Sequence, residues 1–302
     1  MSKESKQDQH SSSEETLAKD LGTLSLTPSA KEGAGGSGKQ KEDIRELFSL
    51  KGRVAAVTGG SRGLGLEMLR TLAACGADVA CLDLLVEEGT RACEEIAKMY
   101  GVEARFYMCD VADEKQVSGA FSWIGKEFSR PVTILVTSAG IVEHIPAREY
   151  PADKFRRVMD INVNGTFFCA QAAANQMLVS GQTGSIIFIG SGAGRTVSRP
   201  MAQPAYSASK AAVAHLAKSL ACEWAPHGIR VNVISPGYME TEELHAVLEE
   251  NPSLRKLWEG FTPMRRIGQP RELRGVVAFL ASEASSYMTG ADLVLDGGYT
   301  CW

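Results

Sequence analysis

A tyrosine and a lysine one helical turn apart are the residues of this 302-residue chain best suited to catalysis. Tyr206 and Lys210 begin an apolar stretch that runs to about Trp224, and its spacing predicts a long helix. Positions i and i+4 share one helical face, so the ammonium would lie near the phenol. A nearby positive charge stabilises phenolate and lowers the pKa of a tyrosine. Such a phenol is suited to exchange a proton with an alcohol or carbonyl oxygen.

Two further polar residues upstream are candidates for the same site. Ser191 follows the apolar run Ser185–Ile189, at the expected carboxyl end of a strand. Ligands bind at that edge of open parallel sheets, although a serine there can equally cap a turn. Asn162 lies within a long helical stretch. An amide in that position is ordinarily a surface residue, but one that faces the sheet edge can hold a water or distort the helix.

A glycine-rich turn follows the first apolar run, Val54–Thr58. Glycines let the backbone turn sharply and approach a pyrophosphate, and the helix that follows offers unpaired N–H groups. The spacing G-x-x-x-G-x-G differs from the ordinary dinucleotide fingerprint, and a plain tight turn remains the alternative. The candidate phosphate-binding residues of this turn are Gly59, Ser61, Arg62, Gly63, Leu64 and Gly65.

Asp83 ends the second apolar run and indicates the type of cofactor. A carboxylate there can accept hydrogen bonds from both adenosine ribose hydroxyls and repel a 2′-phosphate. Its alternative roles are a solvated loop residue or a helix cap. Arg62 in the turn could instead hold a 2′-phosphate. The balance favours NAD, with NADP as the alternative.

The body of the chain alternates short β-rich runs with amphipathic helical stretches, which predicts a parallel sheet with helices on both faces. The fold class is therefore α/β: a Rossmann-like, doubly wound, mostly parallel sheet of seven strands in a single domain. Among the expected helices are Leu64–Cys75, Glu87–Tyr100 and Lys115–Phe128. The expected strands are Val54–Thr58, Val79–Asp83, Ala104–Cys109, Ile134–Ser138, Ser185–Ile189, Val231–Ile234 and Leu293–Leu295.

Composition argues against several classes of protein. The net charge is -4, so no basic field suggests nucleic acid as a partner. No apolar run is long enough to span a membrane, and the N-terminus lacks a signal sequence. Seven cysteines without metal-binding spacing predict reduced thiols in the cytoplasm and no metal site. Cys301 is the candidate if one of them is a redox sensor.

Residues 1–44 differ in composition from the rest and contain no aromatic residue. Such a segment predicts a disordered tail, with 45–302 as the dinucleotide-binding catalytic domain. The stretch Glu14–Leu26 has some helical spacing and is a candidate docking element. Gly33–Lys39 has P-loop spacing, but no strand precedes it and Gln40 follows the lysine, so it is interpreted as a linker.

Over nearly all of residues 50–302, the sequence resembles the short-chain dehydrogenase/reductase family. The resemblance implies that Tyr206 exchanges a proton with a substrate oxygen that Ser191 positions. It also implies that Lys210 lowers the pKa of the tyrosine and binds the nicotinamide ribose, while Asn162 holds a water that relays protons. The resemblance rests on Thr58–Gly65, Asp110-Val111, Ser138-Ala139-Gly140, Asn162, Ser191, Tyr206, Lys210, Pro236-Gly237 and Asp296-Gly297-Gly298.

The same resemblance assigns further cofactor contacts. Asp110 and Val111 would lie against the adenine, and Ser138, Ala139 and Gly140 would contact the cofactor after strand four. Two departures stand out: Thr137-Ser138 replaces the usual Asn-Asn, and the interval from Ser191 to Tyr206 is longer than usual. The extra length falls in residues 195–203, which would shape the substrate mouth. The nicotinamide side would be lined by Pro236, Gly237, Met239 and Thr241, with Thr241 on the carboxamide.

The phrases Ile234–Tyr238 and Asp296–Trp302 look like the fungal subgroup that acts on mannitol, arabinitol, sorbose and similar polyols and ketoses. We therefore expect a sugar alcohol or ketose as the small-molecule substrate. The alternatives are a secondary-metabolite or 3-oxoacyl ketone, and a cofactor-binding scaffold without turnover. Residues 240–264 predict two short helices that form a lid. The family's usual assembly implies a homo-oligomer, a tetramer or a dimer, that packs through the helices near 162–180 and 206–224 and the last strand.

Overall fold

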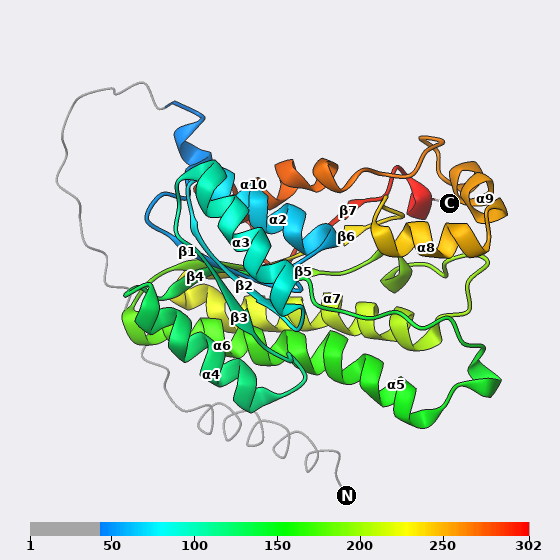
Figure 1. Cartoon of the computed structure of the whole chain (residues 1–302), viewed down its shortest axis with the longest axis horizontal. Helices are drawn as coiled ribbons and strands as arrows, with labels where there is room; N and C mark the ends of the chain where they lie inside the picture. Colours follow the sequence, from blue (N-terminus) through cyan, green and yellow to red (C-terminus); the bar gives the residue numbers. More distant parts are fainter. Residues whose placement is uncertain (1–42, 302) are drawn as a thin grey trace, which may run out of the picture. The chain divides into compact units, whose positions relative to one another are not determined.

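A computed structural model describes residues 43–301 of the chain. The two sequence features interpreted as a docking helix and a linker, Glu14–Leu26 and Gly33–Lys39, lie outside the described residues. Within them, the predicted fold class is confirmed: seven strands form one parallel sheet with helices on both faces (Figure 1).

The strands coincide with the apolar runs of the sequence, and their bounds differ from the predicted ones by at most two residues. Apolar side chains point to both faces of a parallel sheet because helices cover both. The order across the sheet is β3-β2-β1-β4-β5-β6-β7. The strands are β1 (Val54–Thr58), β2 (Asp78–Asp83), β3 (Ala104–Met108), β4 (Val132–Thr137), β5 (Gly184–Ile189), β6 (Ile229–Pro236) and β7 (Asp292–Leu295).

Helices connect successive strands and divide between the two faces. Short 3-10 turns occur among them, including η4 (Gly192–Gly194) and η8 (Tyr299–Cys301), and a π-helical turn, η3, spans Asp160–Asn164. The α-helices are α2 (Gly63–Ala74), α3 (Val86–Tyr100), α4 (Glu114–Glu127), α5 (Ala152–Met159), α6 (Gly165–Ser180), α7 (Pro204–Trp224), α8 (Glu242–Glu250), α9 (Ser253–Phe261) and α10 (Arg274–Ala281).

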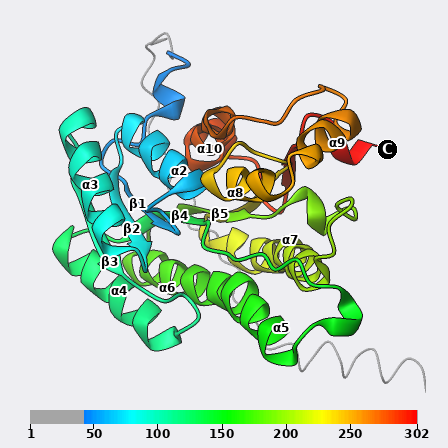
Figure 2. The same ribbon diagram turned by 45° about the vertical axis from the view of Figure 1, so that its right-hand side comes forward.

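Two apolar cores hold the helices against the sheet. Helices α4, α6 and α7 pack on one face through residues such as Phe121, Met177 and Val213. Helices α2, α3 and α10 pack on the other face, with Leu69 and Ile96 among the fully buried side chains. The two layers are visible on opposite sides of the sheet in Figure 2.

The chain order reverses direction across the sheet between β1 and β4. Beyond the carboxyl ends of the strands at such a point, the connections diverge and leave a crevice that commonly binds ligands. The turn after β1 and the segment after β4 meet there, since the backbone of Gly59 lies against Ala139. The fold therefore brings the glycine-rich turn and the catalytic candidates to one edge.

The two helices expected between residues 240 and 264 are present as α8 and α9. They do not join either sheet core but enclose a third apolar cluster of their own. Figure 2 shows them on the same side of the molecule as the amino-terminal half of α7. The cluster consists of Leu248, Leu254, Trp258 and Ile267, packed against Met201, Tyr238, Leu244 and Val247.

Candidate active site

The turn after β1 can exist only with glycine at its tightest points. Gly59 has φ of 66°, and a Cβ there would lie 2.8 Å from the backbone of Ala139. A Cβ on Gly65 would collide with the carbonyl oxygen of Gly59. Gly63 also has a positive φ, 55°, but faces open space. Glycine thus lets the strand, the turn and α2 approach closely, as a phosphate-binding turn requires.

The amino terminus of α2 is open to an anion. Arg62 is its N-cap residue, in extended conformation, and its side chain makes no capping hydrogen bond. The first N–H groups of a helix and its dipole then favour a negative ligand. Leu64, in the first turn, is partly buried against the α2 side of the sheet. The hydroxyl of Ser61 points inward and donates to the Leu85 carbonyl at 3.3 Å.

Asp83 organises the same edge through three backbone N–H groups. Its Oδ2 accepts from Ser61 N at 3.0 Å, and its Oδ1 accepts from Leu84 N at 2.7 Å and Leu85 N at 3.2 Å. The alternative role as cap of the following helix is wrong, because the N-cap residue of α3 is Leu85 and the donors to Asp83 all precede the helix. The carboxylate ends β2 beside the glycine-rich turn, and it can accept from a further donor.

The side chain of Arg62 reaches across to the lid helix. Its guanidinium donates to Glu243 of α8 at 2.9 Å, and both side chains are more than half exposed. Glu243 also acts on Tyr206, because its charge raises the pKa of that phenol. No local sequence pattern predicts the pairing of Arg62 with Glu243, since the two residues are 181 positions apart.

A pocket of about 530 Å³ lies at the carboxyl ends of β2 and β3. Leu84, Met108, Asp110 and Trp123 are among its lining residues. Asp110 is held by Arg157, at 3.1 Å, and accepts from Ala112 N. Its neighbour in sequence is different: Val111 is 6% exposed and belongs to the α4/α6/α7 core. A planar apolar ring fits such a pocket, with Asp110 at its rim.

Tyr206 and Ser191 are brought together at the carboxyl edge of the sheet. Tyr206 lies in the first turn of α7 and Ser191 directly after β5, and the Ser191 side chain lies near enough to the phenol to lower its pKa. Ser191 also accepts from Ala193 N at 3.1 Å, so the turn-capping alternative is fulfilled as well. Two adjacent hydroxyls of this kind can both form hydrogen bonds with one substrate oxygen.

Lys210 lies one turn further along α7, with its Nζ 5.5 Å from the ring centroid of Tyr206. The ammonium donates to the Ile189 carbonyl at 2.8 Å and is only 6% exposed. Burial lowers the pKa of Lys210 to about 8. This side chain faces the centre of the site rather than solvent.

The expected lowering of the tyrosine pKa is wrong for the chain alone. Burial raises the pKa of Tyr206, the hydrogen bond with Ser191 acts in the opposite direction, and Glu243 raises it further. The reason is geometric: Lys210 lies over the ring and is bonded to a carbonyl, so desolvation of the phenol dominates. The phenol is therefore poised as a proton donor.

Asn162 sits in the π-helical turn η3, between α5 and α6, as expected for an amide that distorts its helix. Its Nδ2 donates to Ile141 O and Ser209 Oγ, both at 3.0 Å, and its Oδ1 accepts from Ile141 N at 2.9 Å. A Cβ on Gly140 would lie 3.2 Å from Asn162 Oδ1 and 3.7 Å from Lys210 Nζ. Glycine thus leaves room between these two polar groups.

Ser209 is a site residue that the sequence reasoning missed. It is fully buried, accepts from Asn162 Nδ2, and donates to the Tyr206 carbonyl at 2.7 Å. It therefore links the π-turn to the catalytic helix. Its place between Tyr206 and Lys210 in the sequence could have indicated that it belongs to the site.

The segment after β4 departs from the expected pattern in one respect. Ala139 N donates to Thr58 Oγ1 at 3.1 Å and Ser138 N to Thr58 O at 3.2 Å, which ties the segment to β1. The buried Thr137 hydroxyl has no partner within residues 43–301. A threonine is too short to make the contacts of the usual amide.

The candidates for the nicotinamide side follow β6. Pro236 ends β6, and Gly237 packs so closely on Asp296 that a Cβ would lie 2.7 Å from its Cα. Met239 is 7% exposed and pairs with Gly268. The Thr241 hydroxyl caps α8 by accepting from Leu244 N at 3.2 Å. A hydroxyl that accepts in this way still has its hydrogen to donate.

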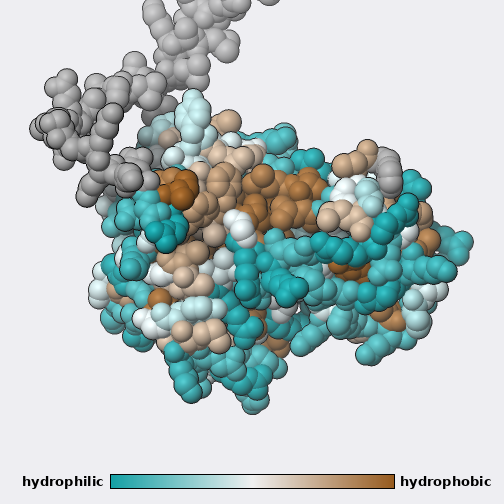
Figure 3. All heavy atoms as spheres, turned by 90° about the horizontal axis from the view of Figure 1, so that it is seen from above, coloured by the Kyte–Doolittle hydropathy of each residue, from teal (hydrophilic) through white to brown (hydrophobic). Residues whose placement is uncertain are grey.

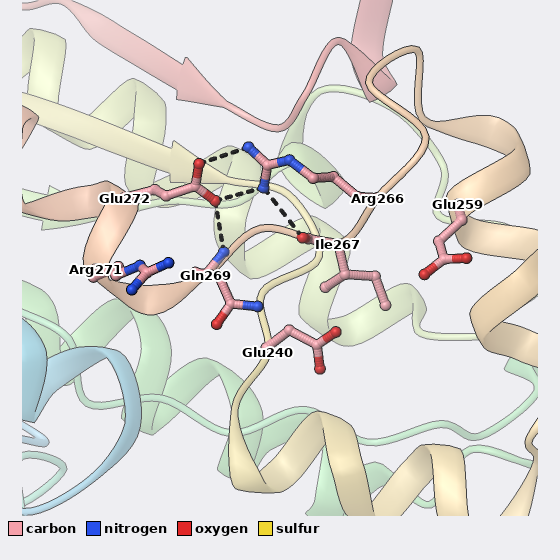
Figure 4. Close-up of a pocket in the computed structure, with 7 residues that line it drawn as sticks. All are labelled: Glu240, Glu259, Arg266, Ile267, Gln269, Arg271 and Glu272. Atoms are coloured by element: carbon pink, nitrogen blue, oxygen red, sulfur yellow. Dashed lines mark hydrogen bonds and ion pairs between the residues drawn. The ribbon is translucent and has the colours of Figure 1, made fainter.

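A second cavity, of about 400 Å³, lies behind the lid helices and contains none of the catalytic candidates. Figure 4 shows part of its polar lining paired: Arg266 binds Glu272, which also accepts from Gln269 N. Glu240, at its wall, binds Arg255 and His245. The first group of pairs stays within residues 266–272 and the second within residues 240–255, and the two segments are joined by the backbone, since Glu240 N donates to Gly268 O at 2.8 Å.

Within residues 43–301, no helix is long and apolar enough to cross a membrane. In the same part of the chain, no group of three or more His, Cys, Asp or Glu side chains gathers to hold a metal.

The chain belongs to the short-chain dehydrogenase/reductase family, since the family profile described as enoyl-(acyl carrier protein) reductase matches residues 59–300. It is 39% identical over 274 residues to D-arabinitol 2-dehydrogenase (ribulose-forming) of Candida tropicalis, covering 86% of this chain and 97% of that protein. It is 42% identical over 260 residues to galactitol 2-dehydrogenase (L-tagatose-forming) of Cereibacter sphaeroides, covering 86% and 100%.

Among solved structures, the chain resembles a gluconate 5-dehydrogenase from Burkholderia cenocepacia J2315 in complex with NADP and tartrate. The TM-score is 0.81 at 34% identity, over 86% of this chain and 100% of that one. The protein is thus an oxidoreductase of a family that uses NAD(P) to interconvert alcohols and ketones.

Proposed function

We propose that this enzyme interconverts a secondary hydroxyl of a sugar alcohol and the carbonyl of a ketose. The observation that carries the proposal is the placement of the Ser191 and Tyr206 hydroxyls at the carboxyl edge of the sheet, with the buried Lys210 one helical turn from the tyrosine. The names of its relatives support the substrate class, because they act on arabinitol and galactitol.

The residues present fit a dinucleotide. The glycine turn, the uncapped start of α2 and the pocket beside Asp110 form one continuous edge for pyrophosphate and adenine. Asp83 would accept from the adenosine ribose, and Gly59, Ser61, Gly63, Leu64 and Gly65 would surround the pyrophosphate through their backbone. Ser138, Ala139 and Gly140 would flank the cofactor from β4.

NAD is the favoured form, with NADP possible. The Asp83 carboxylate repels a 2′-phosphate, and the guanidinium that could bind this phosphate is already paired with Glu243. NADP nevertheless accompanies the similar gluconate 5-dehydrogenase. On the nicotinamide side we assign Pro236, Gly237 and Met239 as the wall and the Thr241 hydroxyl as donor to the carboxamide.

A nicotinamide held by these residues would supply the hydride chemistry that links alcohol and ketone. Tyr206 exchanges the hydroxyl proton with the substrate oxygen, and Ser191 donates to that oxygen and fixes its position. Lys210 would bind ribose hydroxyls and, with the cofactor in place, stabilise the phenolate.

Asn162 completes the proton path. The free lone pair of its Oδ1 and the Lys210 ammonium both border the open space at Gly140. A water held there would pass protons between Lys210 and solvent. Ser209 keeps the amide in this orientation.

We further propose that residues 45–302 act as one catalytic domain, with residues 240–264 as its lid, and that the protein is a cytoplasmic homotetramer. All seven cysteines are free thiols, which fits a reducing compartment. An apolar surface suits the assembly: Figure 3 shows apolar side chains gathered on the face that carries α10. Val276, Phe279 and Leu293 on α10 and β7 remain partly exposed.

The test is absorbance at 340 nm with purified protein, each nicotinamide cofactor and a panel of polyols and ketoses. An NAD-linked signal with a polyol, lost in Tyr206→Phe, would support the proposal. Silence with every sugar, despite cofactor binding, would refute the substrate class. A 3-oxoacyl or secondary-metabolite ketone would then be tested, and silence with those as well would indicate a non-catalytic binder.

A further inference from the structure

The segment between Ser191 and Tyr206 is long, and side chains from other parts of the chain hold its central residues in place. Residues 195–203, the mouth segment, connect η4 to α7. At one end, Arg195 donates to the buried Asp292 at 2.8 Å, and Asp292 also accepts from Ser235 at 2.6 Å. At the other end, Gln203 precedes the first turn of α7. The centre, around Arg199, packs against neither sheet core.

Three aromatic side chains hold the main chain of Arg199 instead. Trp258 Nε1 donates to the Arg199 carbonyl at 3.0 Å, and the Tyr238 hydroxyl approaches the same oxygen at 3.4 Å. The Arg199 N–H donates to the Tyr299 hydroxyl at 3.1 Å. Both main-chain polar groups of one residue are therefore fixed by side chains from distant parts of the chain. We name these three residues the Arg199 clamp.

The clamp is itself rigidly packed. Tyr238 stacks on Trp258 with ring centroids 4.3 Å apart and an angle of 15°, and meets Tyr299 edge-on at 5.3 Å. Trp258 is 2% exposed and is part of the third apolar cluster. Asp296 fixes the turn that carries Tyr299 by accepting from Gly298 N and Thr300 N, both at 2.8 Å.

Each ring comes from a different element. Trp258 belongs to α9, Tyr238 follows β6, and Tyr299 lies in η8. The clamp thus ties the lid, the nicotinamide side and the C-terminal turn to the mouth segment. A displacement of any of them would be transmitted to the segment that joins Ser191 to Tyr206.

We infer that Trp258, Tyr238 and Tyr299 are positioning residues that set the shape of the substrate mouth through the main chain of Arg199. This inference deepens the proposed function and rests on it for the identity of the substrate. Trp258 and Tyr299 lie outside the glycine turn, the pocket beside Asp110 and the proposed nicotinamide wall, so cofactor affinity should not depend on these two.

The test compares Trp258→Phe with Trp224→Phe. The first keeps an aromatic ring for stacking but removes the N–H donor to Arg199. The second removes a buried indole whose Nε1 donates to Glu223, at the far end of α7. Losing one neutral hydrogen bond should raise the KM for the polyol about five-fold in Trp258→Phe. In Trp258→Phe, kcat and the Kd for the cofactor should stay within about two-fold of the values for the unmodified enzyme. In Trp224→Phe, KM, kcat and this Kd should all stay within about two-fold of them.

Tyr299→Phe, which removes the acceptor for Arg199 N–H, should raise the KM by the same factor. It is an independent test of the clamp if Trp258→Phe does not fold. Hydrogen–deuterium exchange supplies a readout without substrate: peptides that cover residues 195–203 should exchange faster in both clamp variants and not in Trp224→Phe. Equal KM values and equal exchange in clamp and control variants would overturn the inference. If the unmodified enzyme turns over no polyol, the proposed function fails, and the exchange experiment alone decides whether the clamp exists.

Discussion

Replacing Lys210 by methionine should stabilise the protein while it removes a residue of the active site. The ammonium is buried, and its pKa falls from 10.5 to about 8. At neutral pH the folded chain must therefore hold a charge in a place that disfavours it. A shift of this size corresponds to about 3 kcal/mol of lost folding free energy. The hydrogen bond to Ile189 O returns about 1 kcal/mol.

The net gain expected for Lys210→Met at pH 7 is thus about 2 kcal/mol in the free energy of unfolding, because both contributions disappear together. The sign depends on pH. Between pH 8 and 10.5 the unfolded chain binds more protons at this position than the folded chain, so the unmodified protein gains stability as pH rises. Above about pH 10.5 the amine is neutral in both states. The variant should then be slightly less stable, by the lost hydrogen bond alone.

Urea denaturation of the cofactor-free protein at several pH values between 7 and 10.5 measures this difference. Lys218→Met is a matched control, because Lys218 is an exposed residue on the same helix. The reasoning is refuted if Lys210→Met is less stable than the unmodified protein at pH 7. It is also refuted if the difference between the two does not change with pH.

Three further substitutions test the assigned roles. Tyr206→Phe should lower turnover about a thousandfold with the cofactor Kd unchanged, as measured by fluorescence titration; activity within tenfold of the unmodified enzyme would exclude Tyr206 as acid/base. Asp83→Asn should weaken NAD about tenfold and NADP much less, and equal losses would remove Asp83 from ribose recognition. Glu243→Gln should lower the pKa of Tyr206, because Glu243 raises it. The pH–rate profile for alcohol oxidation should then move to lower pH, and a move to higher pH would contradict the assignment.

The positions of the strands could be predicted because parallel strands buried on both faces appear as uninterrupted apolar runs. β6 shows the limit of that signal, since it begins at Ile229 rather than at Val231. The start of β6 could not be predicted because Arg230 interrupts the apolar run, and a charged residue at that point is typical of a loop. Its guanidinium is accommodated in the strand because it donates to the Leu280 and Ser282 carbonyls, at 2.9 and 3.1 Å.

Helical spacing, and the rule that parallel strands end at one edge, allowed the sequence to predict that Ser191, Tyr206 and Lys210 lie together. The direction of the pKa shift of Tyr206 could not be predicted, because it depends on how deeply α7 is buried. Contacts such as Trp258 with Arg199 were beyond any local pattern. A tryptophan with helical spacing predicts only an apolar face, and its N–H partner is set by tertiary packing.

The lid helices have an apolar cluster that shares no residue with the two cores of the sheet. Evolution can therefore vary this cluster without weakening the framework that holds the dinucleotide. Mutation accumulates most safely where it does not threaten the fold, and in this chain that place lies beside the proposed substrate mouth. Such separation is how one scaffold can diversify among many alcohols while it keeps a single hydride chemistry.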